Sequence, residues 1–474
     1  MTDAWAPAGS ARSLGNRVQA PRTWVTFRVL CPLIAGGVLV AGCAAGGRRA
    51  DQAVASAGSG QTQAQKPFFD ARAQTAEYVG PGREMPAPED ITEVKIGWFG
   101  PDDPDHATAG MIWQAAALAI EQANQAGGYR GLPFRLVTSW SENPWGTGIG
   151  GVTRLVYEQR VWAIAGGPDG PSAHLVEQVV AKARLAFVSC VSTDKTANLA
   201  NVPWIFSCAP GDHLQAPVLA QALVSQRGAG HFAIVSCTDH DSRLFTTELL
   251  TALNTLKAFP NDHLEFRPGL DDFSRQLQSI RRARPAALAL IAGPADAARF
   301  LTALRREGST VPVFGGPMMG RRKFIEAAGQ SAEGVLFPLL WHRSAAGERS
   351  ATFARGFERR FGVEPDYTAA YTYDALNLLI AAVHQAGLNR VRIRDAVRRL
   401  SPWPGVSGMI TWDPTGQNHR PVRLGTVQNG QTTVVEPKWM NSTKRWIGFW
   451  KGKSGSRRSW PLAIWAKGAR CSMT

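Results

Sequence analysis

The sequence contains no apolar run long enough to cross a membrane. The longest run, residues 30–40, has about eleven residues, whereas a spanning helix needs roughly 20. The G-x-S-x-G motif of serine hydrolases is absent, and the histidines are scattered singly, without the paired spacing of a metal site. The sequence therefore gives no support for a membrane-spanning protein, a hydrolase of that class or a metalloenzyme, and we expect no catalysis, no bound metal and no cofactor.

Cysteine is scarce, with six residues in the chain and no C-x-x-C pair that would indicate a zinc site. Three cysteines lie in the body of the chain, each at the end of a strand-like run: Cys190, Cys208 and Cys237. In an exported protein Cys190 and Cys208 could form a disulfide. The alternative that we favour is three half-buried free thiols.

Acidic residues are outnumbered by basic ones, and the net charge is +15. Most of this excess lies at the two ends, since four Arg and one Asp precede Cys43, and nine Lys/Arg and one Glu lie at 436–474. The body between them carries only about +4, so its charge predicts no nucleic-acid partner. The end segment 436–474 also carries five tryptophans. It is interpreted as an unstructured extension, or as a contact with an anionic membrane surface or nucleic acid.

The N-terminal segment combines a basic start, the apolar run 30–40 and the small residues Val40-Ala41-Gly42 before Cys43. This order resembles a bacterial lipoprotein signal peptide. The resemblance implies that 1–42 is removed, that Cys43 is acylated, and that 43–91 forms a tether and N-terminal extension. We therefore expect a periplasmic or cell-surface protein anchored to a membrane by its lipid; an ordinary secretory signal is the alternative.

From Val94 onward, short apolar strands alternate with longer amphipathic helices, which is typical of βαβ units and a parallel sheet. The first strand is predicted at 94–99, and the following helix at 109–126 ends on Gly127-Gly128. A second series of similar size begins with a helix at 216–226 and a strand at 232–236. Two such series predict an α/β protein with two lobes rather than one large sheet.

Several stretches in this order resemble the periplasmic Leu/Ile/Val-binding protein family, the type I substrate-binding proteins of ABC importers. They include "VKIGWFGPDDP" (94–104), "NQAGGYRGLPFRLV" (124–137), "SAEGVLF" (331–337), "YTYDALNLLIAAV" (371–383) and "GMITWDPTGQ" (408–417). The resemblance implies two Rossmann-like parallel-sheet lobes joined by three crossovers, which we place near residues 210, 332 and 412. Lobe 1 would comprise 92–211 plus 333–412, and lobe 2 would comprise 212–332 plus 413–435.

The ligand is expected where the parallel strands end. The loop 167–172, with Asp169 and Gly170, leads from a strand into a helix, so its amides suit a carboxylate. The resemblance implies that Ser172, Ser192 and Thr193 grip the ligand's α-carboxylate. For each of these residues a helix N-cap is the alternative role.

The sequence departs from the family in the half of the pocket that covers the ligand. Asp241 stands near one tyrosine of the family, Pro294 near another, and Met318 near the glutamate that pairs with an ammonium group. A buried ammonium needs a carboxylate, because an unpaired buried charge is very costly. We therefore expect a ligand with an oxygen-rich end and only a weak demand for an amino group, unless Asp169, Asp239 or Asp241 supplies the carboxylate.

The run from Gly146 to Gly151 matches G-x-G-x-x-G, with Asp169 further along, as in dinucleotide-binding sites. However, the preceding strand ends near Ser139, so these glycines cannot form the tight first turn. We interpret the run as a flexible loop beside the ligand, with Trp145 as an aromatic wall or a packed surface residue.

The sequence thus predicts a lipid-anchored, monomeric solute-binding protein of an ABC importer, whose partners are a small polar solute and the membrane permease. The solute would be of the branched-chain amino acid, amide or carboxylate type. A ligand-sensing receptor subunit of the same fold is the first alternative. An exported nicotinamide-dependent oxidoreductase is the more distant one.

Overall fold

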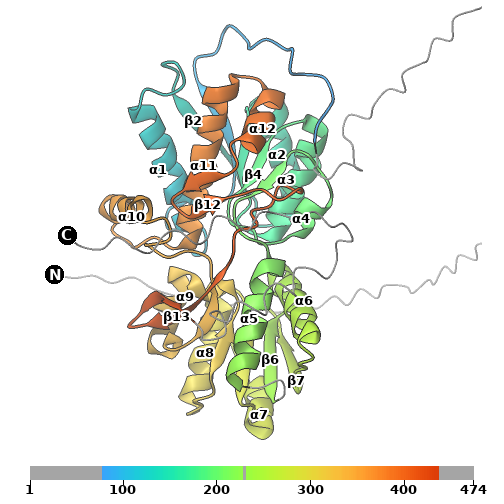
Figure 1. Cartoon of the computed structure of the whole chain (residues 1–474), viewed down its shortest axis with the longest axis vertical. Helices are drawn as coiled ribbons and strands as arrows, with labels where there is room; N and C mark the ends of the chain where they lie inside the picture. Colours follow the sequence, from blue (N-terminus) through green and yellow to red (C-terminus); the bar gives the residue numbers. More distant parts are fainter. Residues whose placement is uncertain (1–76, 228–230, 437–474) are drawn as a thin grey trace, which may run out of the picture. The chain divides into compact units, whose positions relative to one another are not determined.

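The computed structural model describes residues 77–227 and 231–436 (Figure 1). The predicted signal peptide with Cys43, most of the predicted tether, and all of the 436–474 extension after Glu436 lie outside these ranges. Among the described residues, no helix is both long enough and apolar enough to cross a membrane.

The described part of the tether packs firmly on the body of the protein. Tyr78 is 3% exposed, and its ring centroid lies 4.6 Å from that of Trp204. The guanidinium of Arg83 is 2.6 Å from the Asp395 carboxylate. The folded body therefore includes at least residues 78–83 of the predicted extension.

The first sheet has five parallel strands in the order β2-β1-β3-β4-β5, which are β1 (Val94–Phe99), β2 (Phe134–Ser139), β3 (Ile164–Gly166), β4 (Phe187–Ser189) and β5 (Ile205–Ser207). The helices that accompany it are α1 (Gly110–Gln125), α2 (Ile149–Tyr157), α3 (Gly170–Ala183), α4 (Thr196–Leu199), α10 (Glu348–Phe361), α11 (Tyr367–Ala386) and α12 (Arg390–Arg399). Helices α1 and α11, far apart in the sequence, lie side by side (Figure 1). The sheet and these helices form the first lobe.

The second sheet has the order β14-β13-β10-β9-β8-β6-β7. Its strands are β6 (Phe232–Cys237), β7 (Asp262–Phe266), β8 (Ala287–Ile291), β9 (Val313–Gly315), β10 (Leu336–Leu339), β13 (Arg423–Gln428) and β14 (Gln431–Val435). The pairs β10–β13 and β13–β14 are antiparallel, and the others are parallel. This second lobe also contains α5 (Asp212–Arg227), α6 (His240–Thr255), α7 (Ser274–Ala283), α8 (Pro294–Arg306), α9 (Arg322–Ala328) and the short 3₁₀ helices η2 (Pro317–Gly320) and η3 (Gly329–Ala332). The predicted α/β fold class with two parallel-sheet lobes is confirmed.

The chain passes between the lobes three times, after β5, after β10, and after the hairpin of β11 (Trp403–Gly405) and β12 (Gly408–Ile410). The first and third passages are paired, because the Asn418 side chain donates a hydrogen bond of 2.7 Å to the Cys208 carbonyl. The second passage differs from its predicted place near residue 332. Leu336 pairs with β9 and with β13, so this strand belongs to the second lobe and the crossover follows Leu339.

The three body cysteines are free thiols, so the disulfide alternative is not realised. They are also fully buried rather than half-buried, since Cys190, Cys208 and Cys237 each expose 0% of their surface. Burial raises the pKa of Cys190 to about 12, which keeps it protonated and unreactive.

The glycine run that resembles a dinucleotide motif is helical. Its first part lies in a π-helix, η1 (Pro144–Gly148), and its second part begins α2. A Cβ atom on Gly151 would lie 2.2 Å from the Ser139 hydroxyl oxygen, so close packing of α2 on β2 requires this glycine. The run is therefore not the flexible loop expected from the sequence, and no tight strand-to-helix turn exists here for a pyrophosphate.

Candidate functional site

A cavity of about 200 Å³ lies where strands of both sheets end. The loops after β1 to β4 supply residues of the first lobe, while Asp212 at the start of α5 and the loops after β6, β8 and β9 supply residues of the second. Open parallel sheets bind ligands at this edge. The lining includes Pro101, His106, Trp140, Glu142, Asp169, Thr193, Asp212, Asp239, Asp241, Pro294, Met318 and Arg321.

Five of the residues expected at the ligand from the sequence line this cavity: Asp169, Thr193, Asp241, Pro294 and Met318. The other four, Trp145, Gly170, Ser172 and Ser192, are not part of its lining. The predicted loops thus reach the cavity, but only some of the predicted side chains line it.

The start of helix α3 is already capped by acidic side chains. Asp169 is the N-cap and accepts a 2.9 Å hydrogen bond from the Ser172 amide. The Gly170 amide, expected to face the ligand, donates to Asp241 Oδ1 at 3.0 Å. The Ser172 hydroxyl is fully buried, and no described residue accepts or donates a hydrogen bond there. The Gly170 amide was expected to donate a hydrogen bond to a ligand carboxylate. In the structure it is already bonded to Asp241, a carboxylate of the second lobe.

Trp140, rather than Trp145, provides the aromatic part of the wall. Its indole nitrogen donates to Glu142 at 2.8 Å, and its ring centroid lies 5.6 Å from that of Phe99. Trp145 lies in η1 and is 53% exposed. Trp140 could have been expected at the cavity from the sequence, because it directly follows β2. Trp145 lies five residues further along the chain, in η1.

The acidic groups of the cavity repel one another. Burial, followed by the charge of Asp169, raises the pKa of Asp241 to about 7. Asp212 was not expected from the sequence; burial raises the pKa of its carboxyl well above the ordinary value. Its Oδ1 is buried, and no described residue forms a hydrogen bond with it. Asp212 therefore offers a free polar atom to a solute.

Arg321 is the buried cation of the site. It is 7% exposed, and its Nε donates to the Tyr367 hydroxyl at 3.0 Å. Burial lowers its pKa, but the contact with Tyr367 and the nearby Asp366 and Asp241 carboxyls outweigh burial and raise it, so the guanidinium remains charged. Neither of its terminal nitrogens has a hydrogen-bond partner among residues 77–227 and 231–436. These donors suit a carboxylate, which a guanidinium binds in a bidentate manner.

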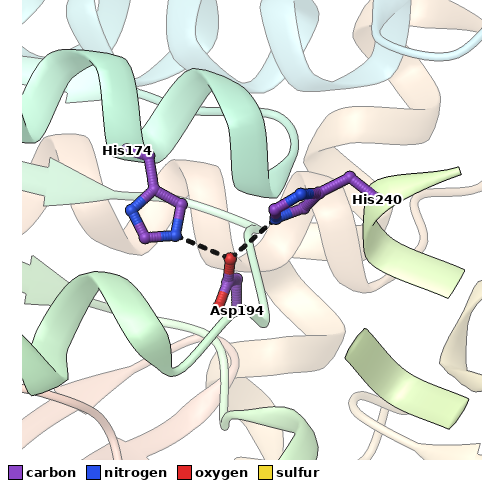
Figure 2. A group of neighbouring side chains, drawn as sticks. All are labelled: His174, Asp194 and His240. Atoms are coloured by element: carbon purple, nitrogen blue, oxygen red, sulfur yellow. Dashed lines mark hydrogen bonds and ion pairs between the residues drawn. The ribbon is translucent and has the colours of Figure 1, made fainter. Parts of the chain in front are cut away.

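Beside the cavity, Asp194 accepts hydrogen bonds from two imidazoles, His174 at 2.9 Å and His240 at 3.0 Å (Figure 2). Burial raises the pKa of Asp194, but these hydrogen bonds and those from Thr196 outweigh burial and hold it well below its usual value. The hydrogen bonds to Asp194 and then to Glu177 raise the pKa of His174 to about 9. Sequence spacing gave no sign of this group, because its members lie on three separate segments.

Two Rossmann-like lobes, three crossovers and a cavity at the strand ends define a type I periplasmic binding protein. A family model described as periplasmic binding protein matches residues 93–432. The chain therefore belongs to the periplasmic binding protein family, which confirms the resemblance found in the sequence and places the chain among binding proteins rather than enzymes.

Solved structures share this fold. The leucine-binding protein LivK of Thermotoga maritima is 22% identical, with a TM-score of 0.66 over 72% of this chain and 98% of that chain. LivJ of Streptococcus pneumoniae, in complex with isoleucine, is 19% identical, with a TM-score of 0.67 over 73% and 100%. A solute-binding protein of R. palustris, in complex with benzoate, is 14% identical, with a TM-score of 0.64 over 72% and 95%. No curated protein sequence is significantly similar to the chain.

Proposed function

We propose that the protein is the solute-binding subunit of an ABC importer and that it closes its two lobes around a small organic carboxylate. The observation that carries this proposal is the buried Arg321, whose terminal nitrogens have no partner among the described residues and which lines a cavity shared by both lobes. Arg321 lines the cavity, so a ligand carboxylate that enters it can accept hydrogen bonds from these charged donors.

The size of the cavity limits the solute. At about 200 Å³ it is smaller than pockets for drug-sized ligands, which have roughly 300–1,000 Å³. A cavity of about 150 Å³ holds a benzene molecule. One amino acid or one aromatic acid therefore fits, and both classes occur among ligands of proteins with this fold, as isoleucine and benzoate.

The proposal is tested by thermal unfolding with isoleucine, leucine, benzoate and 3,4-dihydroxybenzoate. A ligand at about 100 times its Kd adds roughly 2.7 kcal/mol to the free energy of unfolding, so a true solute raises the midpoint clearly. Stabilisation by nicotinamide nucleotides alone would contradict the proposal and favour an exported oxidoreductase.

Replacing Asp241 with asparagine distinguishes an amino acid from a simple carboxylate as the solute. If Asp241 pairs with an ammonium group, the Asp241→Asn variant should bind the amino acid about 3–5 kcal/mol more weakly, with its des-amino analogue unaffected. The contact of Asp241 with the Gly170 amide leads us to expect the other result. Calorimetry should show that Asp241→Asn binds the des-amino acid as tightly as the natural protein does, or more tightly, because the competing carboxylate is gone. Weaker binding of the amino acid alone would contradict this expectation.

We further propose that Cys43 carries a lipid that holds the protein at the outer face of a membrane. The support is the sequence around Cys43, with a basic and then an apolar segment before it. The Cys43→Ser variant should incorporate no labelled fatty acid and should be recovered uncut or released from the membrane. Equal labelling of the variant and the natural protein would refute lipidation at this residue.

A further inference from the structure

The group of His174, Asp194 and His240 has the composition of a metal site. Their ligand atoms all lie within 4.8 Å of one another. Figure 2 shows that both rings direct a nitrogen toward the same carboxylate oxygen. The Asp194 side chain is 2% exposed, while those of His174 and His240 are 21% and 39% exposed. The carboxylate is thus fixed in the protein, and the exposed ring edges leave a path for an ion to enter.

A second carboxylate orients the first imidazole. Glu177, one turn along α3, lies 3.2 Å from Nδ1 of His174. A carboxylate on this nitrogen holds the proton there and directs the lone pair of the other nitrogen outward, as in many zinc sites. In His174 that other nitrogen, Nε2, faces Asp194 at 2.9 Å. Nε2 donates a proton to this carboxylate oxygen, as the His240 ring does, and a bound cation would replace these protons between the rings and the carboxylate.

We propose that His174, Asp194 and His240 bind a divalent transition-metal ion, with Zn²⁺ as the best match. Two imidazole nitrogens and one carboxylate oxygen are common Zn²⁺ ligands, at about 2.0–2.2 Å from the metal. Tetrahedral ligands at this distance are separated by roughly 3.3 Å. The two imidazole–carboxylate separations, 2.9 and 3.0 Å, are close to this value, and all three ligand atoms lie within 4.8 Å of one another. Three protein ligands leave a fourth position for water or a solute atom.

The proposed site joins the two lobes. His174 lies on α3 and Asp194 follows β4, both in the first lobe, while His240 begins α6 of the second. The neighbours of His240, Asp239 and Asp241, line the solute cavity. A bound ion would therefore hold the lobes together at the edge of this cavity. The inference goes beyond the proposed solute binding and does not depend on which solute is bound.

Metal binding is measured on the purified full-length protein, by competition with a chromophoric chelator for Zn²⁺ and by the visible spectrum of bound Co²⁺. We expect one Zn²⁺ per chain and a Co²⁺ spectrum of low-symmetry coordination by nitrogen and oxygen. His174→Gln and His240→Gln should each weaken Zn²⁺ binding by about 100-fold or more. Glu177→Gln, which removes only the outer carboxylate, should weaken it by about 10–100-fold.

The matched control is His419→Asn, which removes an exposed imidazole elsewhere on the protein and should leave Zn²⁺ affinity unchanged. Zn²⁺ should also raise the unfolding midpoint of the natural protein and of the control, but not of His240→Gln. Zn²⁺ affinity equal in the natural protein and in His240→Gln would overturn the proposal. A Co²⁺ spectrum identical to that of the free aqueous ion would overturn it as well, and would assign the cluster to protonated histidines.

Discussion

The Arg321→Gln variant should bind the carboxylate solute about 2–5 kcal/mol more weakly than the natural protein, a loss of at least roughly 30-fold in Kd. The reason is that the guanidinium is buried, stays charged, and has terminal nitrogens with no partner among the described residues. Glutamine can replace one hydrogen bond but not the charge. The measurement is calorimetry with whichever of isoleucine and benzoate binds the natural protein better.

The neighbouring residue provides the matched control. Arg322 is at the surface, where its Nε lies 3.0 Å from Glu326, and it does not line the cavity. Arg322→Gln should therefore leave the Kd unchanged.

The amide analogue of the solute, isoleucinamide or benzamide, separates the charge from other effects of the substitution. The natural protein should bind the acid much more tightly than the amide, and Arg321→Gln should bind both about equally. A similar loss for acid and amide would mean that Arg321 maintains the shape of the cavity without binding the carboxylate.

The strands of the first lobe could be predicted because each is short, apolar and bounded by turns. The predicted strand at 94–99 coincides with β1, and the strand expected to end near Ser139 is β2. Strand β14 was missed because its sequence, Gln431–Val435, begins with three polar residues and is only half-buried at the edge of the sheet. Apolar patterning reports burial, so it finds central strands more readily than edge strands.

The sheet to which β10 belongs could not be predicted from the segment's own sequence. The segment that contains β10 falls within 333–412, which was predicted to belong to the first lobe. Its neighbours are β9, which is close in sequence, and β13, which is about 90 residues away. These pairings place the second crossover after Leu339, and the pattern of apolar residues within the segment does not specify them.

The sequence could indicate which loops lie at the candidate site, but not all of the side chains that line it. Asp169 and Thr193 follow β3 and β4, and the topology of parallel strands brings such loops to one edge. Arg321 was missed because a short 3₁₀ helix, η2, separates it from β9 and turns it back toward the cavity. The same limit applies to His174 and His240, which meet only because α3 and α6 both begin at the strand ends of their own sheets.

The largest loss of stability is expected from Asp374, a buried carboxylate outside the cavity. It lies on α11 and accepts hydrogen bonds of 2.7 Å from the amides of Val406 and Ser407. These amides belong to the hairpin of β11 and β12, which precedes the third crossover. Alanine at 374 would leave two buried N–H groups without acceptors, at about 1–3 kcal/mol each. We expect Asp374→Ala to lower the free energy of unfolding by about 3–4 kcal/mol in urea titrations.

The pH dependence of this loss tests its physical cause. Burial raises the pKa of Asp374 to about 6 in the folded protein from an ordinary 3.8, against the lowering effect of the hydrogen bonds from Ser407 and Val406. An acid with a raised folded pKa contributes stability below its unfolded pKa, and that contribution is lost as the pH rises through the folded pKa. The difference between the natural protein and Asp374→Ala should therefore be larger at pH 5 than at pH 7. Asp90→Asn, at an exposed carboxyl, is the control and should unfold like the natural protein. A difference that instead grows toward pH 7 would show that the two amides stabilise the ionised carboxylate more than burial destabilises it.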